Sequence, residues 1–315
     1  MQPLKTKPEP LKTELERLSV KQPLNLEQQR TNTQIITGSC PSRPGTVDIV
    51  TRYLYKQGFY INEIHSFDDT DKQRFFIRIE FRPDQLEHFD RERFINEFAP
   101  KAVSFDMDWK LTQKSYKSKV VIMVSKHDHC LNDLLYRYRI GDLDIEIPAI
   151  ISNHPDLEAL AKWHGIPYFH LPISKQTKPQ QEAQVWKIIQ DCDADLVVLA
   201  RYMQVLTNEM CQKLSGWAIN IHHSLLPGFK GAKPYYQAYD KGVKLVGATA
   251  PYVSDDLDEG PIITQGVEVV DHSYYPKDLA AKGRDIECQT LSRAVRWHIE
   301  QRVFLHGEKS VVFAK

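Results

Sequence analysis

The hydrophobic and polar positions divide the chain into two regions with different patterns. In the first region, some segments alternate between apolar and polar residues, which is typical of strands with one buried face. Other segments between them have apolar positions at helical spacing. These patterns predict strands at residues 33–40, 60–67, 74–81 and 102–110, and helices over residues 47–54 and 84–99. The order strand, helix, strand, strand, helix, strand is that of a ferredoxin-like α+β domain.

From residue 120 onward the pattern changes to apolar strands that alternate with amphipathic helices. Continuous apolar runs such as residues 196–199 fit strands that are covered on both faces. Strands are predicted at residues 120–124, 145–151, 168–171, 195–200, 218–222, 245–253 and 262–270, with helices such as 130–139 between the earlier ones and a last long helix over 278–304. This order predicts a Rossmann-like α/β domain with an open, mainly parallel, doubly wound sheet.

A polar and basic segment, residues 112–119, separates the two patterns, and we interpret it as a linker between domains. A chain of 315 residues exceeds a typical single core, so two domains are expected, over residues 31–111 and 120–315. Residues 1–30 are rich in Lys, Glu, Gln and Pro and lack an apolar run. They predict a mobile N-terminal extension rather than a secretory signal.

Composition narrows the classes of function. Lys and Arg together number 41, as do Asp and Glu, which argues against a protein that holds nucleic acid by bulk charge. The five cysteines are odd in number and include no Cys-x-x-Cys pair, which favours a reduced, cytoplasmic compartment. No apolar run approaches the roughly 18 residues that a membrane crossing requires. We therefore expect a cytoplasmic protein with neither nucleic-acid nor membrane partners.

Two polar side chains follow one predicted strand. Asn220 and His222 are two residues apart where the strand at 218–222 ends, so alternation places both on one face of the sheet. The carboxyl ends of strands are where open α/β sheets bind their ligands. An asparagine amide can donate a hydrogen bond to a developing oxyanion, and histidine can carry a proton near neutral pH. The pair predicts a site for acid–base chemistry, although a lone buried histidine at a strand end is commonly structural.

An acidic loop follows the predicted strand at residues 245–253. Asp255, Asp256, Asp258 and Glu259 lie within five residues. Crowded carboxylates of like charge hold a proton more readily than isolated ones. One of them is therefore a candidate for accepting a proton or orienting a water molecule, and the others are interpreted as solvated loop charges.

These segments resemble the formyltransferase fold family, which includes glycinamide ribonucleotide transformylases, methionyl-tRNA formyltransferases and formyltetrahydrofolate deformylases. The resemblance covers residues 119–315 and rests on Asn220-Ile221-His222, on Ser224-Leu225-Leu226-Pro227, and on Asp258 ahead of Gly260-Pro261-Ile262-Ile263. It is greatest to the deformylases because of His164-Gly165-Ile166-Pro167-Tyr168, Leu199-Ala200-Arg201-Tyr202-Met203-Gln204 and Lys282-Gly283-Arg284-Asp285-Ile286-Glu287. The first region resembles an ACT domain, which the deformylases carry and the transformylases lack.

The resemblance implies hydrolysis of 10-formyltetrahydrofolate to formate and tetrahydrofolate, which supplies formate for purine synthesis and balances the one-carbon folate pools. It assigns Asn220, His222 and Asp258 as the catalytic groups around the formyl carbon, with water as the nucleophile. It places the folate ring near Tyr202, Met203, Gln204, Leu206, Val253 and Ser254. Neither a cofactor nor a metal is expected, because the histidines at 127, 129 and 154 lack the cysteine or carboxylate spacing of a metal site.

The loop at residues 125–130 gives an independent indication of the formyl acceptor. A glycine-rich loop at a helix N-terminus would suit a phosphorylated amine, and Ser125-Lys126-His127-Asp128-His129-Cys130 contains no glycine. Water is therefore favoured over an amine. Formyl transfer to an amine is kept as an alternative. A folate-binding sensor of impaired activity is kept as a second alternative. Pro251 stands where family members commonly have histidine, and a proline cannot donate a backbone hydrogen bond.

In the ACT-like domain, Arg43 and Gly45 lie at the predicted strand–helix turn. Gly45 would let backbone N–H groups approach a small amino-acid effector, and an ordinary tight turn explains the two residues equally well. Because ACT domains commonly pair with one another, we expect a homo-oligomer, either a dimer or a tetramer.

Overall fold

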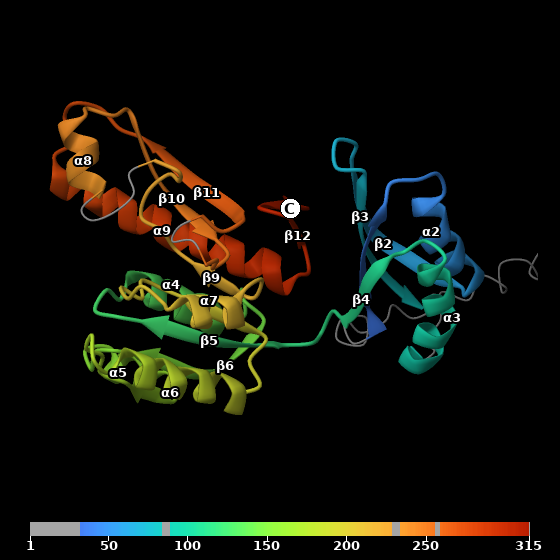
Figure 1. Ribbon diagram of the computed structural model, residues 1–315, viewed down its shortest axis with the longest axis horizontal. Coiled ribbons are helices and arrows are strands. Elements are labelled where there is room, and N and C mark those ends of the chain that lie inside the picture. The colour runs from blue at the N-terminus through green and yellow to red at the C-terminus, as the bar shows by residue number, and fades with distance from the viewer. Residues whose placement is uncertain (1–31, 84–88, 229–233, 256–258, 315) are drawn as a thin grey trace, which may run out of the picture.

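The computed structural model describes residues 32–83, 89–228, 234–255 and 259–314. The predicted N-terminal extension, residues 1–30, lies outside the described residues. Two folded units are joined by the extended chain that runs from β4 into β5 (Figure 1). The first unit contains β1 (Gln34–Pro41), α2 (Thr46–Lys56), β2 (Phe59–Asp69), β3 (Arg74–Pro83), α3 (Arg91–Val103) and β4 (Asp108–Gln113).

The four strands of the first unit form one antiparallel sheet in the order β2-β3-β1-β4. Together with the order of the elements, this sheet confirms the predicted ferredoxin-like α+β unit. The alternation along β3 explains how the sheet is covered. Phe75, Ile77, Ile79 and Phe81 pack with α2 and α3 in one core, whereas residues between them face the opposite side of the sheet.

The predicted strand at residues 102–110 is wrong in its first half. Helix α3 continues to Val103, and β4 begins at Asp108. Phe94, Phe98 and Ala102 are spaced four residues apart and are all buried in the same core. Ala102 therefore belongs to the apolar stripe of the helix, not to the strand that follows.

The second unit begins with β5 (Ser118–Val124), and its helices and strands follow one another along the chain. No helix in the described ranges is both long enough and apolar enough to cross a membrane. After β5 the elements are α4 (His129–Arg139), β6 (Ile145–Ser152), α5 (Glu158–Trp163), β7 (Tyr168–His170), α6 (Lys178–Asp191), β8 (Leu196–Leu199), α7 (Asn208–Leu214), β9 (Ala218–Asn220), α8 (Pro234–Asp240), β10 (Leu245–Pro251), β11 (Ile262–Val269), α9 (Pro276–Ile299), β12 (Val303–His306) and β13 (Lys309–Val312).

Five strands of the second unit form a parallel sheet in the order β7-β6-β5-β8-β9. Along the central strand β5, Val120 and Ile122 pack in the core that contains α4 and α9. Val121 and Met123 pack in the other core, with α6 and α7. Figure 1 shows α9 and α6 on opposite sides of the sheet. Burial on both faces accounts for the continuous apolar runs, and the predicted mainly parallel, doubly wound sheet is confirmed.

Strands β10 and β11 form a separate antiparallel pair beside the parallel sheet. This pair meets β9 through two isolated antiparallel bridges, Ile219 with Tyr252 and His222 with Thr249. The bridges bring β10 to the carboxyl end of β9, and α9 packs against the pair.

The segment between the two units is shorter than the predicted linker at 112–119. β4 extends to Gln113, which pairs with Gln34 of β1. β5 begins at Ser118, which pairs with Ile145 of β6. Only residues 114–117 lie between the two strands. The polar composition of residues 112, 113, 118 and 119 predicted a loop, but strand pairing satisfies the backbone groups there.

The last helix ends earlier than the prediction of 278–304. Helix α9 stops at Ile299, and Phe304 lies in β12, which pairs with β13. Gln301 has a left-handed φ of 55°, which ends the helical path. The ring of Phe304 packs against Phe76 of β3, with 5.6 Å between the ring centroids. The C-terminal hairpin thus contacts the first unit, on the face of its sheet that the helices leave open.

Candidate active site

The carboxyl ends of β5, β8 and β9 meet at one edge of the parallel sheet. β5 and β8 are neighbours, but the chain leads from one toward β6 and from the other toward β9. Such a switch point is where open α/β sheets bind ligands. The hydroxyl of Ser125, directly after β5, donates to Asn153 Oδ1 at 2.7 Å and accepts from the N–H of Met203 at 2.9 Å. The segments after β5, β6 and β8 are therefore joined at this edge.

A pocket of about 220 Å³ lies at this edge. Asn220, the last residue of β9, lines the pocket together with Gln204 and Leu206, which follow β8, and with Val253 and Ser254, which follow β10. The structure thus brings five of the predicted site residues to one cavity. Apolar walls with a few polar groups suit a flat ring that has hydrogen-bonding edges.

His222 lies two residues beyond Asn220, where the chain meets β10. Its backbone N–H donates to the Thr249 carbonyl at 2.8 Å, and the N–H of Thr249 donates to the His222 carbonyl at 2.9 Å. The side chain is buried, at 6% exposed. His222 is not among the described residues that line the pocket.

The turn that follows His222 is held by one buried hydroxyl. Thr249 Oγ1 donates to the Ser224 carbonyl at 2.8 Å and accepts from the N–H of Leu226 and from Gln265 Nε2, each at 3.0 Å. Gln265 Nε2 also donates to the Leu226 carbonyl at 3.0 Å. Because these bonds pin both sides of the turn, the segment that carries His222 has a fixed path.

Tyr202 and Met203 do not line the pocket in the described part of the chain. The Tyr202 hydroxyl accepts from Gln181 Nε2 at 3.1 Å inside the core beneath the sheet, where burial raises its pKa. The Met203 side chain is 51% exposed, and its backbone is bonded to Ser125. These two residues anchor the segment from which Gln204 reaches the pocket.

Asp258 lies outside the described residues, but both ends of its loop are described. The N–H of Tyr252 donates to the Pro261 carbonyl at 2.9 Å. A Cβ on Gly260 would lie 1.8 Å from the Tyr252 carbonyl oxygen, so only glycine allows the two ends to approach this closely. Asp255, at the start of the loop, lines the pocket. The loop therefore leaves from the edge of the pocket.

Pro251 also lines the pocket and is the last residue of β10. The pairing of β10 with β11 shifts its register between Ala250 and Pro251. A proline is tolerated at such an irregularity because the missing N–H interrupts no regular ladder. Backbone bonding resumes at once, since the N–H of Val253 donates to the Ala218 carbonyl at 2.8 Å.

Arg43 and Gly45 lie at the turn between β1 and α2, far from this pocket along the fold. Gly45 has a φ of 90°, which favours glycine. The Arg43 guanidinium stacks 3.9 Å from the centre of the Phe105 ring and donates to the Ser104 carbonyl. These contacts account for a tight turn, and the amino-acid effector stays a prediction.

The fold and the pocket can be set beside known proteins. A family model described as formyl transferase matches residues 118–295. The formyltetrahydrofolate deformylase of Corynebacterium sp. (strain P-1) is 52% identical over 278 residues, which cover 88% of this chain and 97% of that protein. The chain belongs to the formyltetrahydrofolate deformylase family.

Solved structures divide this family from its neighbours. The crystal structure of a deformylase from Pseudomonas putida KT2440 is 61% identical, with a TM-score of 0.84, and covers 89% of this chain and 100% of its own. Glycinamide ribonucleotide transformylase 1 from Symbiobacterium toebii is 28% identical, with a TM-score of 0.58, and covers 62% of this chain and 94% of its own. The deformylases match both units, whereas the transformylase leaves more than a third of this chain unmatched.

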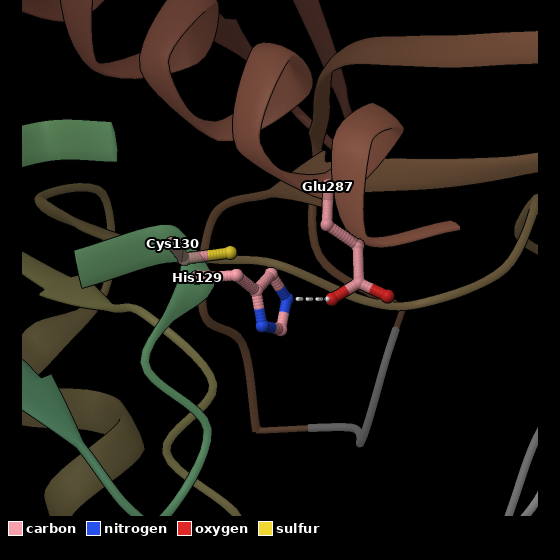
Figure 2. Close-up of side chains that lie close together, drawn as sticks. All are labelled: His129, Cys130 and Glu287. Atoms are coloured by element: carbon pink, nitrogen blue, oxygen red, sulfur yellow. Dashed lines mark hydrogen bonds and ion pairs between the residues drawn. The ribbon is translucent and has the colours of Figure 1, made fainter. Parts of the chain in front are cut away.

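In this member of the deformylase family, a buried cluster beside the site was not predicted from the sequence. Glu287 of α9 is 1% exposed. One of its oxygens, Oε2, lies 2.8 Å from His129 Nε2 and 3.3 Å from Arg201 Nε, and the Tyr235 hydroxyl donates to the other at 2.8 Å. Figure 2 shows the His129 ring pointing at this carboxylate, with Cys130 beside it.

The charges of this cluster balance. Burial works to raise the pKa of the Glu287 carboxyl, but the hydrogen bond with His129 and the charge of Arg201 outweigh it, so this pKa lies below its usual value. Burial and the nearby Glu287 carboxylate raise the pKa of the Tyr235 hydroxyl. Glu287 is therefore an anion that Arg201 neutralises, and Tyr235 is a neutral donor.

The same residues offer a possible set of metal ligands. Atoms of His129, Cys130 and Glu287 that could bind an ion lie within 4.8 Å of one another. However, Glu287 already hydrogen-bonds to His129 and Tyr235 and forms an ion pair with the guanidinium of Arg201. The hydrogen bond with Cys288, together with burial, raises the pKa of the Cys130 thiol, whereas a metal requires the thiolate. These residues fit an ion-paired network better than a metal centre.

One signal in the sequence could have pointed to this cluster. Gly283, Glu287 and Leu291 are four residues apart and lie on the buried face of α9. A carboxylate on the apolar stripe of a long helix needs a buried partner. The partners of Glu287 come from three distant segments. The helical pattern could therefore show that Glu287 requires buried partners, but not which residues they are.

Proposed function

We propose that this chain hydrolyses 10-formyltetrahydrofolate to formate and tetrahydrofolate in the pocket lined by Asn220. The observation that carries the proposal is the similarity over both units to proteins named formyltetrahydrofolate deformylase, at 52% identity over 88% of the chain. The pocket supports it, because Leu206 and Val253 offer apolar cover for a pterin ring while Gln204 and Ser254 offer polar groups for its edge.

In the proposed reaction, water attacks the formyl carbon and a carbon–oxygen bond forms. The Asn220 amide donates a hydrogen bond to the formyl oxygen as negative charge develops there, and His222 supplies a ring that can carry a proton. Asp258 orients the water and accepts its proton. The carbon–nitrogen bond then breaks as a proton passes to the leaving nitrogen. Water is the only co-reactant, and nothing is oxidised or reduced.

Water is proposed as the acceptor in preference to a phosphorylated amine. The segment before α4 contains no glycine, and the Glu287 carboxylate lies 2.8 Å from the ring of His129, the first residue of that helix. The ring of His129 is therefore already engaged by a carboxylate, and the segment lacks the glycines that let backbone N–H groups approach a phosphate. Because Pro251 is accommodated at an irregularity of β10, no described feature favours the sensor of impaired activity.

The test is formate release by the purified protein with 10-formyltetrahydrofolate as sole substrate. We expect formate and tetrahydrofolate in equal amounts, at a rate that an added amine such as glycinamide ribonucleotide leaves unchanged. Turnover that depends on the amine would overturn hydrolysis in favour of transfer. Tight folate binding without turnover under either condition would favour a sensor.

The first unit is proposed to mediate self-association. β2 is an edge strand of its sheet, and it exposes Tyr60, Ile64 and Phe67. Edge strands with exposed apolar side chains pair readily with another strand. Light scattering on the purified protein should give the mass of a dimer or tetramer, and a monomer at all concentrations would contradict the proposal.

A further inference from the structure

The Glu287 cluster joins the stretch after β8, part of which lines the pocket, to the segment near His222. Arg201 begins the stretch after β8 from which Gln204 and Leu206 line the pocket. Tyr235 lies near the start of α8, and its ring lies 6.3 Å, between centroids, from that of His223, the residue after His222. One oxygen of Glu287 contacts Arg201, and the other accepts from Tyr235. A single carboxylate therefore connects the stretch after β8 with the start of α8, beside His223.

Arg201 is held in a conformation that it does not favour by itself. Its φ is 64°, in the left-handed region that residues with a Cβ rarely adopt. It is nevertheless buried, at 8% exposed, with its Nε 3.3 Å from Glu287. The following two residues have anchors of their own, since Tyr202 accepts from Gln181 and Met203 donates to Ser125. Glu287 is the charged partner of Arg201 in the described part of the chain, and Lys178 holds the stretch further along by donating to the Val205 carbonyl.

The position of Tyr235 depends on a glycine of α9. A Cβ on Gly283 would lie 1.9 Å from the Tyr235 hydroxyl oxygen. Gly283 lies one turn before Glu287, so the ring crosses the helix at the glycine and its hydroxyl reaches the carboxylate. A glycine in a helix interior lowers the stability of the helix. At position 283 it allows the Tyr235 ring to approach the helix closely.

We propose that Glu287 is a positioning residue of the folate pocket, which fixes the stretch after β8 relative to the segment that carries His222 by bonding Arg201 and Tyr235. This inference rests on the proposed function for the identity of the ligand. Glu287 acts through Arg201 and does not itself contact the folate. Without the carboxylate, the Arg201 guanidinium would be buried without its counter-charge, so the left-handed turn at Arg201 would relax and the stretch that leads to Gln204 would rely on the hydrogen bonds of Tyr202 and Met203 alone.

The variant Glu287→Gln removes the charge and keeps the size of the side chain. We expect the KM for 10-formyltetrahydrofolate to rise about tenfold and kcat to fall less than about threefold, because the stretch after β8 loosens while Thr249 still holds the turn that follows His222. Glu63→Gln is the matched control, since Glu63 also pairs with buried arginines, Arg78 and Arg302, but at the contact between the two units. The control should leave KM within about twofold. Equal changes of KM in the two variants would overturn the proposal.

A double-variant cycle separates positioning from a general loss of packing. If Arg201 and Glu287 act as one unit, Arg201→Gln should raise KM about as much as Glu287→Gln, and the double variant no more than either. Effects that multiply, to about a hundredfold, would show independent roles and overturn the proposal. If the charge variants do not fold, Tyr235→Phe removes one hydrogen bond and keeps the ring. It should raise KM about threefold, and an unchanged KM would overturn the proposal.

Tetrahydrofolate binding, measured by calorimetry, distinguishes failure of this inference from failure of the proposed function. If the wild type binds tetrahydrofolate but releases no formate, hydrolysis is wrong, while about tenfold weaker binding by Glu287→Gln supports positioning. If the wild type releases formate and Glu287→Gln keeps its KM and its affinity, positioning is wrong and hydrolysis stands. A wild type that neither binds nor releases overturns both.

Discussion

Helix α9 takes part in two buried groups of charged side chains, which differ in what they connect. The group at its middle, around Glu287, joins the stretch after β8, part of which lines the pocket, to the start of α8. The group just beyond its end joins the two units. There, Arg302 Nη2 lies 3.0 Å from Glu63 Oε2 of β2, and Arg78 of β3 donates to the Glu300 carbonyl at 3.1 Å.

The difference teaches that buried ion pairs at the middle of a helix and just beyond its end can connect different parts of the molecule. Around Glu287, one arginine balances one carboxylate. At the junction, Arg78 and Arg302, each 1% exposed, share Glu63. Burial works to raise the pKa of Glu63, but the hydrogen bond with His65 and the charges of both arginines lower it to about 2. Loss of a junction residue should therefore weaken the contact between units, and loss of Glu287 should weaken substrate binding.

The largest expected effect is a loss of kcat on replacement of Asp258. Asp258→Asn should lower kcat about a thousandfold, or about 4 kcal/mol of transition-state stabilisation, because the water loses its proton acceptor. Tetrahydrofolate affinity and the free energy of unfolding should stay as in the wild type. Formate release, calorimetry and urea unfolding measure the three quantities. A variant with full activity would show that another group activates the water.

The next effect belongs to the junction. Arg302→Met should lower the free energy of unfolding by about 3 kcal/mol, because Glu63 and the Phe313 carbonyl lose a buried partner. KM should not change, in contrast to Glu287→Gln. Arg296→Met, near the end of α9 and six residues before Arg302, is the control. Arg296 is 35% exposed, so its pair with Asp142 should contribute less than about 1 kcal/mol. If Arg302→Met raised KM as Glu287→Gln does, the two groups would not be separable.

The sequence predicts the two sheets because their periodicities are local. β3 shows this, since Phe75, Ile77 and Ile79 alternate with residues of the other face and were recognised as a strand. The residues between them have partners that no local pattern encodes. Arg78 bonds Glu300, 222 positions away. For the same reason the end of α9 was predicted wrongly, because the ring of Phe304 packs on the first unit and not along the helix.

The site was predictable to the extent that it depends on strand ends. Asn220 stands where alternation and the end of β9 place it, and it lines the pocket. Tyr202 and Met203 came from resemblance alone, and their side chains lie outside the pocket. Glu287 was missed because its role depends on Arg201, whose left-handed backbone and distant partner are tertiary properties.

His298 lies on α9 between the two groups, and its burial makes the stability of the protein depend on pH. Its Nδ1 lies 2.7 Å from the hydroxyl of Tyr252, next to the pocket. Burial lowers the pKa of His298 from 6.5 to about 4. The unfolded chain thus takes up a proton more readily, so this contribution to stability is complete above pH 6.5 and is lost as the pH falls toward 4.

The size of this loss follows from the shift. The full shift corresponds to about 3 kcal/mol, of which about 2 kcal/mol should be lost between pH 7 and pH 5, because the folded pKa of about 4 lies below this interval. His298→Gln should remove this part of the acid dependence, which urea unfolding at pH 7 and pH 5 measures. A variant that loses as much stability as the wild type over this interval would show that other groups cause it.

The smallest expected effect concerns Pro251, on the strand that leads from the pocket to Tyr252. Pro251→Ala should change kcat and KM less than about twofold and the free energy of unfolding by at most about 1 kcal/mol, because the irregular pairing at Ala250 leaves no regular ladder bond for the new N–H to restore. Formate release and urea unfolding measure these quantities. A tenfold gain in kcat would mean that the proline limits the site. In that case the comparison of the Glu287 group with the junction group would not account for all of the control of activity. The end of β10, which is followed by Tyr252 and its contact with His298, would control activity as well.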